Sequence, residues 1–201
     1  MSTFRMPAIP AELHWKNKPL DWKLRPDNSL MIQAGENTDL FNNPASDSVQ
    51  DDVPCALFTP PDLEFILSAK VTVDFASDFD AGVLQIRAGE DRWAKLCFEY
   101  STRQEPMVVS VVTRGRSDDC NSVVIAGNTV YLRMAVTAQA IAFHYSLDGS
   151  FWHFVRFFTI GKLGRPLVGF SSQAPRGPKC SAVFSEISYR PGIIADNRSG
   201  E

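Results

Sequence analysis

The sequence predicts an all-β protein, most simply a two-sheet antiparallel jelly-roll sandwich. Short runs rich in aromatic and β-branched residues recur at near-regular spacing, separated by clusters of Gly, Pro, Asn and Asp. No segment keeps a helical hydrophobic period for more than a turn or two. The 14 Phe and 4 Trp among 201 residues also favour strands. Sandwiches of this size commonly form one unit, so we expect a single domain over 1–201 with its core at about 13–190.

The predicted strands follow one another along the whole chain. They are 29–34, 55–58, 64–75, 82–88, 92–100, 107–114, 130–136, 140–146, 151–158, 167–171 and 182–189. Pro60 and Pro61 end the second run, and Asp148-Gly149 marks a hairpin between 140–146 and 151–158. Residues 36–54 are polar, and we expect a long loop over one mouth of the sandwich. The polar tail from Gly192 is expected to fray.

Composition excludes several classes of function. The formal net charge is −3 with no basic cluster, which argues against nucleic acid as a partner. No run approaches the roughly 20 apolar residues of a membrane span, and the first residues lack the apolar stretch of a leader. We therefore expect a cytoplasmic protein that binds neither nucleic acid nor membrane.

Motifs for metal, cofactor and catalysis are missing from the sequence. The four cysteines and three histidines show no metal-ligand spacing, and no GxSxG, GxxxxGK[ST] or GxGxxG motif occurs. A glycosidase needs two carboxylates about 5–10 Å apart, and no strand carries a closely spaced set of them. We predict no catalytic residues, no metal and no cofactor.

The candidate ligand-binding residues are Trp93, Lys95, Glu99, Arg133 and Arg156. Alternation over 92–100 places the first three on one face of a strand, where an exposed Trp could stack on a sugar ring or a peptide; a polar, solvent-exposed face is the simpler alternative. The two arginines interrupt apolar strand runs. Each arginine either holds an anion or a sugar hydroxyl in a groove or forms a structural ion pair, with Glu99 as a possible partner.

A second polar cluster extends from Arg114 to Asn121 and contains Gly115. We interpret it as a polar turn whose side chains cap backbone amides. Asp118 and Asp119 could hold a cation there, but the D-x-[DN]-x-[DN]-G pattern of a calcium loop is absent.

Several short sequence motifs, taken in their order and spacing, resemble those of a known protein family over about residues 13–190. They are Thr38-Asp39-Leu40-Phe41, Asp80-Ala81-Gly82-Val83-Leu84, Trp93-Ala94-Lys95 with Glu99, Ser110-Val111-Val112-Thr113, Ser117-Asp118, Leu132-Arg133, Tyr145-Ser146-x-Asp148-Gly149-x-x-Trp152 with Arg156, and Val168-Gly169-Phe170 with Ala174-Pro175. The chain resembles an uncharacterised family of concanavalin-A-like domains, the group that includes the yeast regulation-of-enolase protein. The resemblance implies two curved antiparallel sheets with one concave face and no established activity. It also makes Lys95, Glu99, Arg133 and Arg156 candidates for that face.

These observations support a non-catalytic binding module with a polar ligand, a carbohydrate in the first instance, on the concave face. The alternative is a regulatory protein that binds another protein through an apolar patch drawn from Phe151, Trp152, Phe157 and Phe158. A glycoside hydrolase or lyase that uses Glu99 is a third hypothesis.

Overall fold

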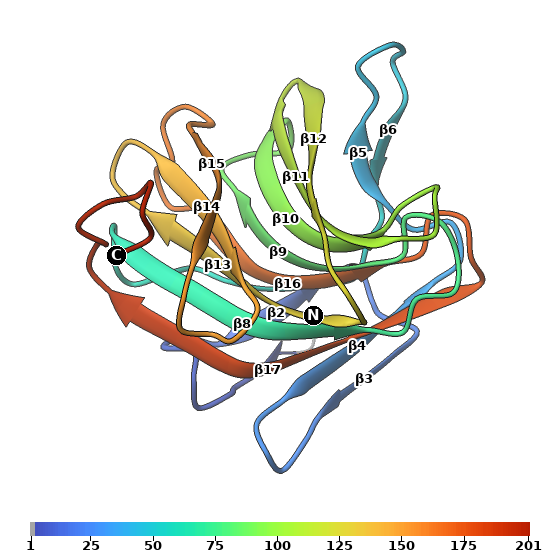
Figure 1. Ribbon diagram of the computed structural model, residues 1–201, viewed down its shortest axis with the longest axis horizontal. Coiled ribbons are helices and arrows are strands. Elements are labelled where there is room, and N and C mark those ends of the chain that lie inside the picture. Colours follow the sequence, from blue (N-terminus) through green and yellow to red (C-terminus); the bar gives the residue numbers. More distant parts are fainter. Residues whose placement is uncertain (1–2) are drawn as a thin grey trace.

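The computed structural model describes residues 3–201, which form two large antiparallel sheets packed face to face (Figure 1). The larger sheet has the strand order β1 (Thr3–Phe4), β2 (Leu13–Lys16), β7 (Cys55–Phe58), β16 (Leu167–Gln173), β9 (Ala81–Arg87), β10 (Arg92–Tyr100), β11 (Pro106–Arg114) and β12 (Arg116–Val124). The smaller sheet has the order β15 (His153–Phe158), β14 (Ile141–Ser146), β13 (Thr129–Val136), β8 (Phe65–Val73), β17 (Lys179–Pro191), β4 (Leu30–Gly35) and β3 (Asp21–Leu24). A separate hairpin joins β5 (Leu40–Asn42) and β6 (Val49–Asp51). The predicted jelly-roll sandwich is confirmed.

The core between the sheets is built by period-two alternation. Strand β8 shows this most clearly, because Leu67, Ala69, Val71 and Val73 are buried in the core while the residues between them are partly exposed. Where strands pack closest, only glycine fits. A Cβ at Gly169 would lie 1.9 Å from the carbonyl oxygen of Ala56 on the neighbouring strand β7. The sequence therefore fixes both which face is buried and how closely the strands approach.

The outer face of the larger sheet is also covered, in part by the β5–β6 hairpin. Figure 1 shows β9 to β12 curving so that this face is concave, with the hairpin standing beside it. Asn42 anchors the hairpin to β12, because its backbone N–H donates to Ser117 Oγ (2.9 Å) and its Nδ2 donates to the carbonyl oxygen of Gly115 (2.9 Å). At the other strand, Asp51 pairs with Lys16 (2.8 Å) and with Arg87. The hairpin is thus fixed at both strands.

All of the eleven predicted strands are present, and six further strands are not among them: β1, β2, β3, β5, β6 and β12. Residues 36–54 contain the β5–β6 hairpin rather than forming a structureless loop, and the polar cluster after Gly115 is strand β12 rather than a turn. The expected fraying of the tail is wrong as well: Ile194 is buried, and the carbonyl oxygen of Gly200 accepts a hydrogen bond from Arg133. Residues 3–201 contain no helix with the length and apolarity of a membrane span.

Candidate functional site

Strand β10 carries the candidate site on its outer face. Because Ala94, Leu96 and Phe98 point into the core, alternation turns Lys95 and Glu99 to the concave side. Strand pairing then adds neighbours from the other strands of the sheet. Lys95 lies between Gln85 of β9 and Val111 of β11, and Val111 pairs in turn with Asp119 of β12. Glu99 lies between Ala81 and Met107, and Ala81 pairs with Gln173 of β16.

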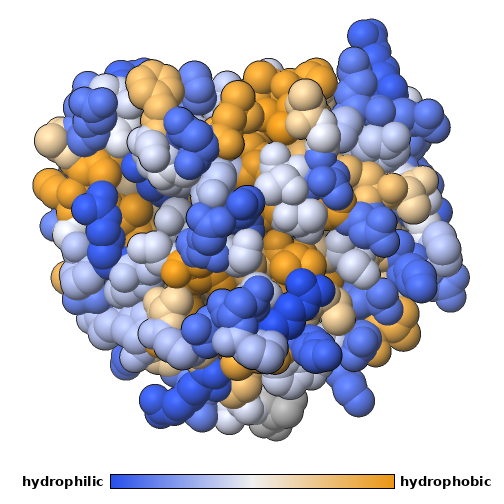
Figure 2. Space-filling view, turned by 60° about the horizontal axis from the view of Figure 1, so that its bottom comes forward, coloured by the Kyte–Doolittle hydropathy of each residue, from blue (hydrophilic) through white to orange (hydrophobic). Residues whose placement is uncertain are grey.

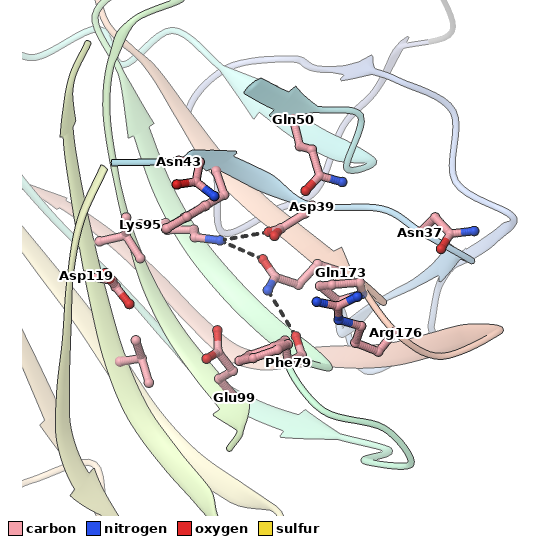
Figure 3. Close-up of a pocket in the computed structure, with 14 residues that line it drawn as sticks. Asn37, Asp39, Asn43, Gln50, Phe79, Lys95, Glu99, Asp119, Gln173 and Arg176 are labelled. Atoms are coloured by element: carbon pink, nitrogen blue, oxygen red, sulfur yellow. Dashed lines mark hydrogen bonds and ion pairs between the residues drawn. The ribbon is translucent and has the colours of Figure 1, made fainter. Parts of the chain in front are cut away.

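Lys95 is a buried cation with defined partners. Its side chain is 3% exposed, and its Nζ lies 3.3 Å from Asp39 Oδ1 and 2.9 Å from Gln173 Oε1 (Figure 3). Gln173 is itself oriented by a hydrogen bond from its Nε2 to the carbonyl oxygen of Phe79 (3.0 Å). Burial acts to lower the pKa of Lys95, but the Asp39 carboxylate and other nearby negative groups outweigh burial and raise it. Lys95 therefore stays charged and held in place.

Glu99 is the unpaired group of the site. Among the described residues, no hydrogen bond or ion pair joins its carboxyl to another side chain. Burial raises the pKa of Glu99 to about 7; Lys95 opposes this rise, whereas Asp39 and Asp119 add to it. Near neutral pH the carboxyl is therefore present in both protonation states, so it can donate or accept a hydrogen bond.

The pocket between these groups has a volume of about 440 Å³. Val109 and Val111 of β11 form an apolar part of its lining, and Phe41 and Phe79 contribute aromatic rings. Polar side chains complete it: Asn37, Asn43, Gln50 and Arg176 (Figure 3). Phe79 has a φ of 69°, a strained conformation for a bulky residue. Its backbone N–H donates to Tyr100 O (2.7 Å) and its carbonyl oxygen accepts from Gln173, and these bonds hold the strained residue at the pocket.

Of the polar residues that line this pocket, sequence reasoning assigned only Lys95 and Glu99 to the ligand site; the residues it missed include Asp39, Asp119 and Gln173. The sequence predicts a loop around Asp39 and a turn around Asp119, and Gln173 lies just beyond the predicted strand 167–171. The signal for Asp119 is the alternation after Gly115. Buried Ser117 bonds with Thr113 on the concave side (2.8 Å), and Asp119 is two residues further along the same strand.

Three of the five predicted ligand residues do not reach the pocket. Trp93 shares the outer face of β10 but is completely buried against Leu40 and Val53 under the hairpin segment, so no ligand can stack on it. Arg133 and Arg156 lie on the smaller sheet. The expected convergence of four charged residues is therefore corrected: only Lys95 and Glu99 come together.

The two arginines differ from each other as well. Arg156 pairs with Asp118 of β12 (2.9 Å), which is the structural ion pair considered above, with Asp118 rather than Glu99 as the partner. Alternation places Asp118 on the opposite side of β12 from Asp119, so this pair faces away from the pocket. Arg133 lies on the outer face of the smaller sheet, because its neighbours Leu132 and Met134 point into the core.

The apolar patch required by the protein-binding alternative is only partly exposed. Phe151 and Phe157 are exposed, whereas Trp152 and Phe158 are half-buried. Trp152 stacks on Arg133, and Phe158 packs edge-on against Phe143. Figure 2 shows one face of the molecule, on which hydrophobic residues reach the surface in several patches separated by hydrophilic ones.

No group of three or more His, Cys, Asp or Glu side chains within residues 3–201 has the geometry of a metal site.

Comparison with known proteins identifies the family. Residues 15–192 match the family described as "Protein of unknown function (DUF1349)". The chain belongs to this family. The DUF1349 match includes every strand of the pocket and both Lys95 and Glu99. No curated protein matches the chain significantly.

Solved structures with the same fold have little sequence in common with this DUF1349 chain. A functionally unknown protein from Saccharomyces cerevisiae has 22% identity and a TM-score of 0.81, over 90% of this chain and 97% of that one. The GH43 protein BlXynB from Bacillus licheniformis has 16% identity and a TM-score of 0.71, over 90% of this chain but 36% of that one. An alginate lyase from Klebsiella pneumoniae has 12% identity and a TM-score of 0.58, over 85% and 84%. These likenesses show the fold, and the link to enolase regulation stays an expectation.

Proposed function

We propose that the concave pocket binds a polar, hydroxyl-rich ligand, with a carbohydrate as the class that fits best, and that the protein is a binding module. The observation that carries the proposal is the Glu99 carboxyl, which is partly buried, has no hydrogen-bond or ion-pair partner among residues 3–201 and faces the same pocket as the fixed cation Lys95. A buried polar group without a protein partner is costly unless something else bonds to it.

The chemistry of the pocket matches a sugar on two counts. Lys95 uses two of its three donors on Asp39 and Gln173, which leaves one for a hydroxyl. Glu99 near its pKa can serve a hydroxyl as donor or acceptor. The valines and the rings of Phe41 and Phe79 offer apolar surface to the C–H face of a sugar ring. These phenylalanines take the stacking role that the sequence assigned to Trp93.

A glycan array followed by calorimetry tests the proposal. We expect saturable binding of at least one glycan, weakened about tenfold or more by Asp119→Asn or Glu99→Ala, since hydrogen bonds to charged groups contribute about 1.5–3 kcal/mol each. The matched control is Arg156→Gln, which changes a charged residue that faces away from the pocket and should leave binding unchanged. Absence of binding to every glycan, or binding that the pocket variants leave unaltered, would contradict the proposal.

A second candidate function, polysaccharide cleavage, is favoured by one observation. Asp39, Glu99 and Asp119 line the same pocket, and a carboxyl with a pKa of about 7 suits a general acid at neutral pH. Proteins with this fold include a xylan β-1,4-xylosidase and an alginate lyase, although this chain covers only 34% of the xylosidase. Assays on xylan and alginate with Glu99→Gln separate the functions. Cleavage lost with binding kept assigns catalysis to Glu99, and cleavage that survives removes Glu99 from that role.

A further inference from the structure

A second pocket, of about 410 Å³, lies on the outer face of the smaller sheet, on the opposite side of the sandwich from Glu99. A cross-strand row crosses it: Arg133 of β13 pairs with Ser68 of β8, and Ser68 pairs with Ser188 of β17. Neighbouring strands are about 4.8 Å apart, so the guanidinium and both hydroxyls lie within reach of one small ligand. Arg190 follows two residues after Ser188 on the same face and lines the same pocket.

Arg133 is a buried cation without a counter-ion among the residues that the structure describes. It is 5% exposed, its Nη2 donates to the carbonyl oxygen of Gly200 (2.7 Å), and its guanidinium stacks on the Trp152 ring at 4.2 Å. Its Nε is buried and has no hydrogen-bond partner in the described part of the chain. Burial, helped by the charge of Arg190, lowers the pKa of Arg133 to about 10, so the group remains charged at neutral pH. Within residues 3–201, no carboxylate lies within ion-pair distance of it.

The two carboxylates that line the pocket are already occupied. Asp148 accepts hydrogen bonds from Ser146 Oγ and from the backbone N–H groups of Ser150 and Phe151, at 3.0, 2.8 and 2.9 Å. Glu186 accepts from Lys70 Nζ and from the Tyr131 hydroxyl, at 3.1 and 2.8 Å. Neither is free to neutralise the guanidinium.

A backbone irregularity fixes Glu186 in that arrangement. The β8–β17 register shifts between Ser185 and Ser188, and Glu186 adopts a φ of 47°, which is unusual for a residue other than glycine. Such bulges re-aim side chains and occur preferentially beside functional sites. The bulge commits Glu186 to Lys70 and Tyr131 while Ser188 stays beside Arg133.

We propose that this second pocket binds the carboxylate group of a small monoanionic ligand. The guanidinium of Arg133 donates hydrogen bonds to the carboxylate and neutralises its negative charge. The hydroxyls of Ser68 and Ser188 donate to the carboxylate oxygens, and the positive charge of Arg190 attracts the ligand at the rim of the pocket. A planar guanidinium matches a carboxylate through paired N–H donors, and after the bond from Nη2 to Gly200 Arg133 keeps the two N–H groups of Nη1 and the second N–H of Nη2 for this purpose. Asp148 and Glu186 in the wall repel a doubly charged phosphate more strongly than a singly charged carboxylate, so the pocket prefers the latter.

Titration of the ¹⁵N-labelled protein with sodium acetate near pH 7 tests this assignment, with the Arg133 Nε–H cross-peak as the reporter. At constant ionic strength we expect a saturable shift with a Kd on the order of 1–10 mM, and weaker binding of inorganic phosphate. Arg190→Gln changes an exposed side chain, so it should fold normally and weaken acetate binding about threefold. Arg133→Lys keeps the positive charge but loses the paired N–H donors of the guanidinium, and it should weaken acetate binding about tenfold or more. The control Arg103→Gln removes an exposed arginine elsewhere and should change nothing.

Three results would overturn the proposal: no saturable shift with acetate, an equal shift with chloride, or phosphate binding tighter than acetate. Acetate binding that Arg190→Gln leaves unaltered would also do so, and this variant keeps the test decisive if Arg133→Lys does not fold.

Discussion

Replacing Glu99 with Gln tests the electrostatics of the concave pocket directly. The pKa of Glu99 rises from 4.5 to about 7 on folding because burial disfavours the charged carboxylate. The folded chain therefore holds this proton more tightly than the unfolded chain. The resulting stabilisation is fully present below about pH 4.5 and is lost as the pH rises through 7.

The magnitude follows from the size of the pKa change. Each pKa unit corresponds to about 1.4 kcal/mol, which gives about 3 kcal/mol, and screening of the partly exposed carboxyl reduces this to about 2 kcal/mol. Glutamine has nearly the same shape but no charge at any pH. Relative to the wild type, Glu99→Gln should therefore gain about 2 kcal/mol in unfolding free energy between about pH 5 and pH 8.5.

Urea unfolding at the two pH values measures this difference. The control is Glu105→Gln, which changes an exposed carboxylate at the β10–β11 turn, and its effect should be nearly independent of pH. If the stability difference between Glu99→Gln and the wild type is the same at both pH values, Glu99 is an ordinary solvated carboxylate and the reasoning about the pocket fails.

Three further predictions concern other charged groups. Lys95→Met should lower the unfolding free energy measured in urea by about 3 kcal/mol, because it leaves the partners Asp39 and Gln173 without the cation they bind. The same variant should raise the pKa of Glu99 measured by NMR. A loss of unfolding free energy below about 1 kcal/mol would contradict a buried Lys95–Asp39 pair. Burial lowers the pKa of His144 to about 4, so the unfolding free energy falls as the pH drops from about 6.5 towards 4. His144→Gln should lessen that fall by about 2 kcal/mol. Parallel plots of unfolding free energy against pH for the variant and the wild type would refute this. Arg156→Gln should cost less than about 1 kcal/mol in thermal unfolding, because Asp118 is 64% exposed; a loss as large as that of Lys95→Met would be unexpected.

The strands that sequence reasoning found are those with clear alternation or apolar runs. Residues 92–100 match β10 to the residue because the apolar core residues Ala94, Leu96 and Phe98 alternate with outer-face residues that include the charged Lys95 and Glu99. Strand β12 was missed because its Ser-Asp-Asp sequence is typical of a turn, although here it forms the edge of a sheet, where charged residues hinder aggregation. The β5–β6 hairpin is polar and depends on contacts with Trp93 and β12, which no local pattern reveals.

Only part of the site could be predicted for a related reason. Period two shows which residues of one strand share a face, so Lys95 and Glu99 were placed together. It does not show which sheet a strand joins, so Arg133 and Arg156 were assigned to the wrong face. Asp39 and Gln173 come from segments 56 and 78 residues away from Lys95, and only the strand order brings them to it.

Glu99 and Arg133 illustrate one physical relation on opposite faces of the sandwich. Each is an ionisable side chain at least partly buried, with no ion pair to another side chain among residues 3–201, and burial moves the pKa of each towards its neutral form. Such residues lower the stability of the fold, since apolar residues of similar volume would pack without that penalty. Neither is needed to specify the core, which the alternating apolar positions already define. Under the two proposals made above, a ligand balances that cost, and the two pockets beside these residues provide the space for one.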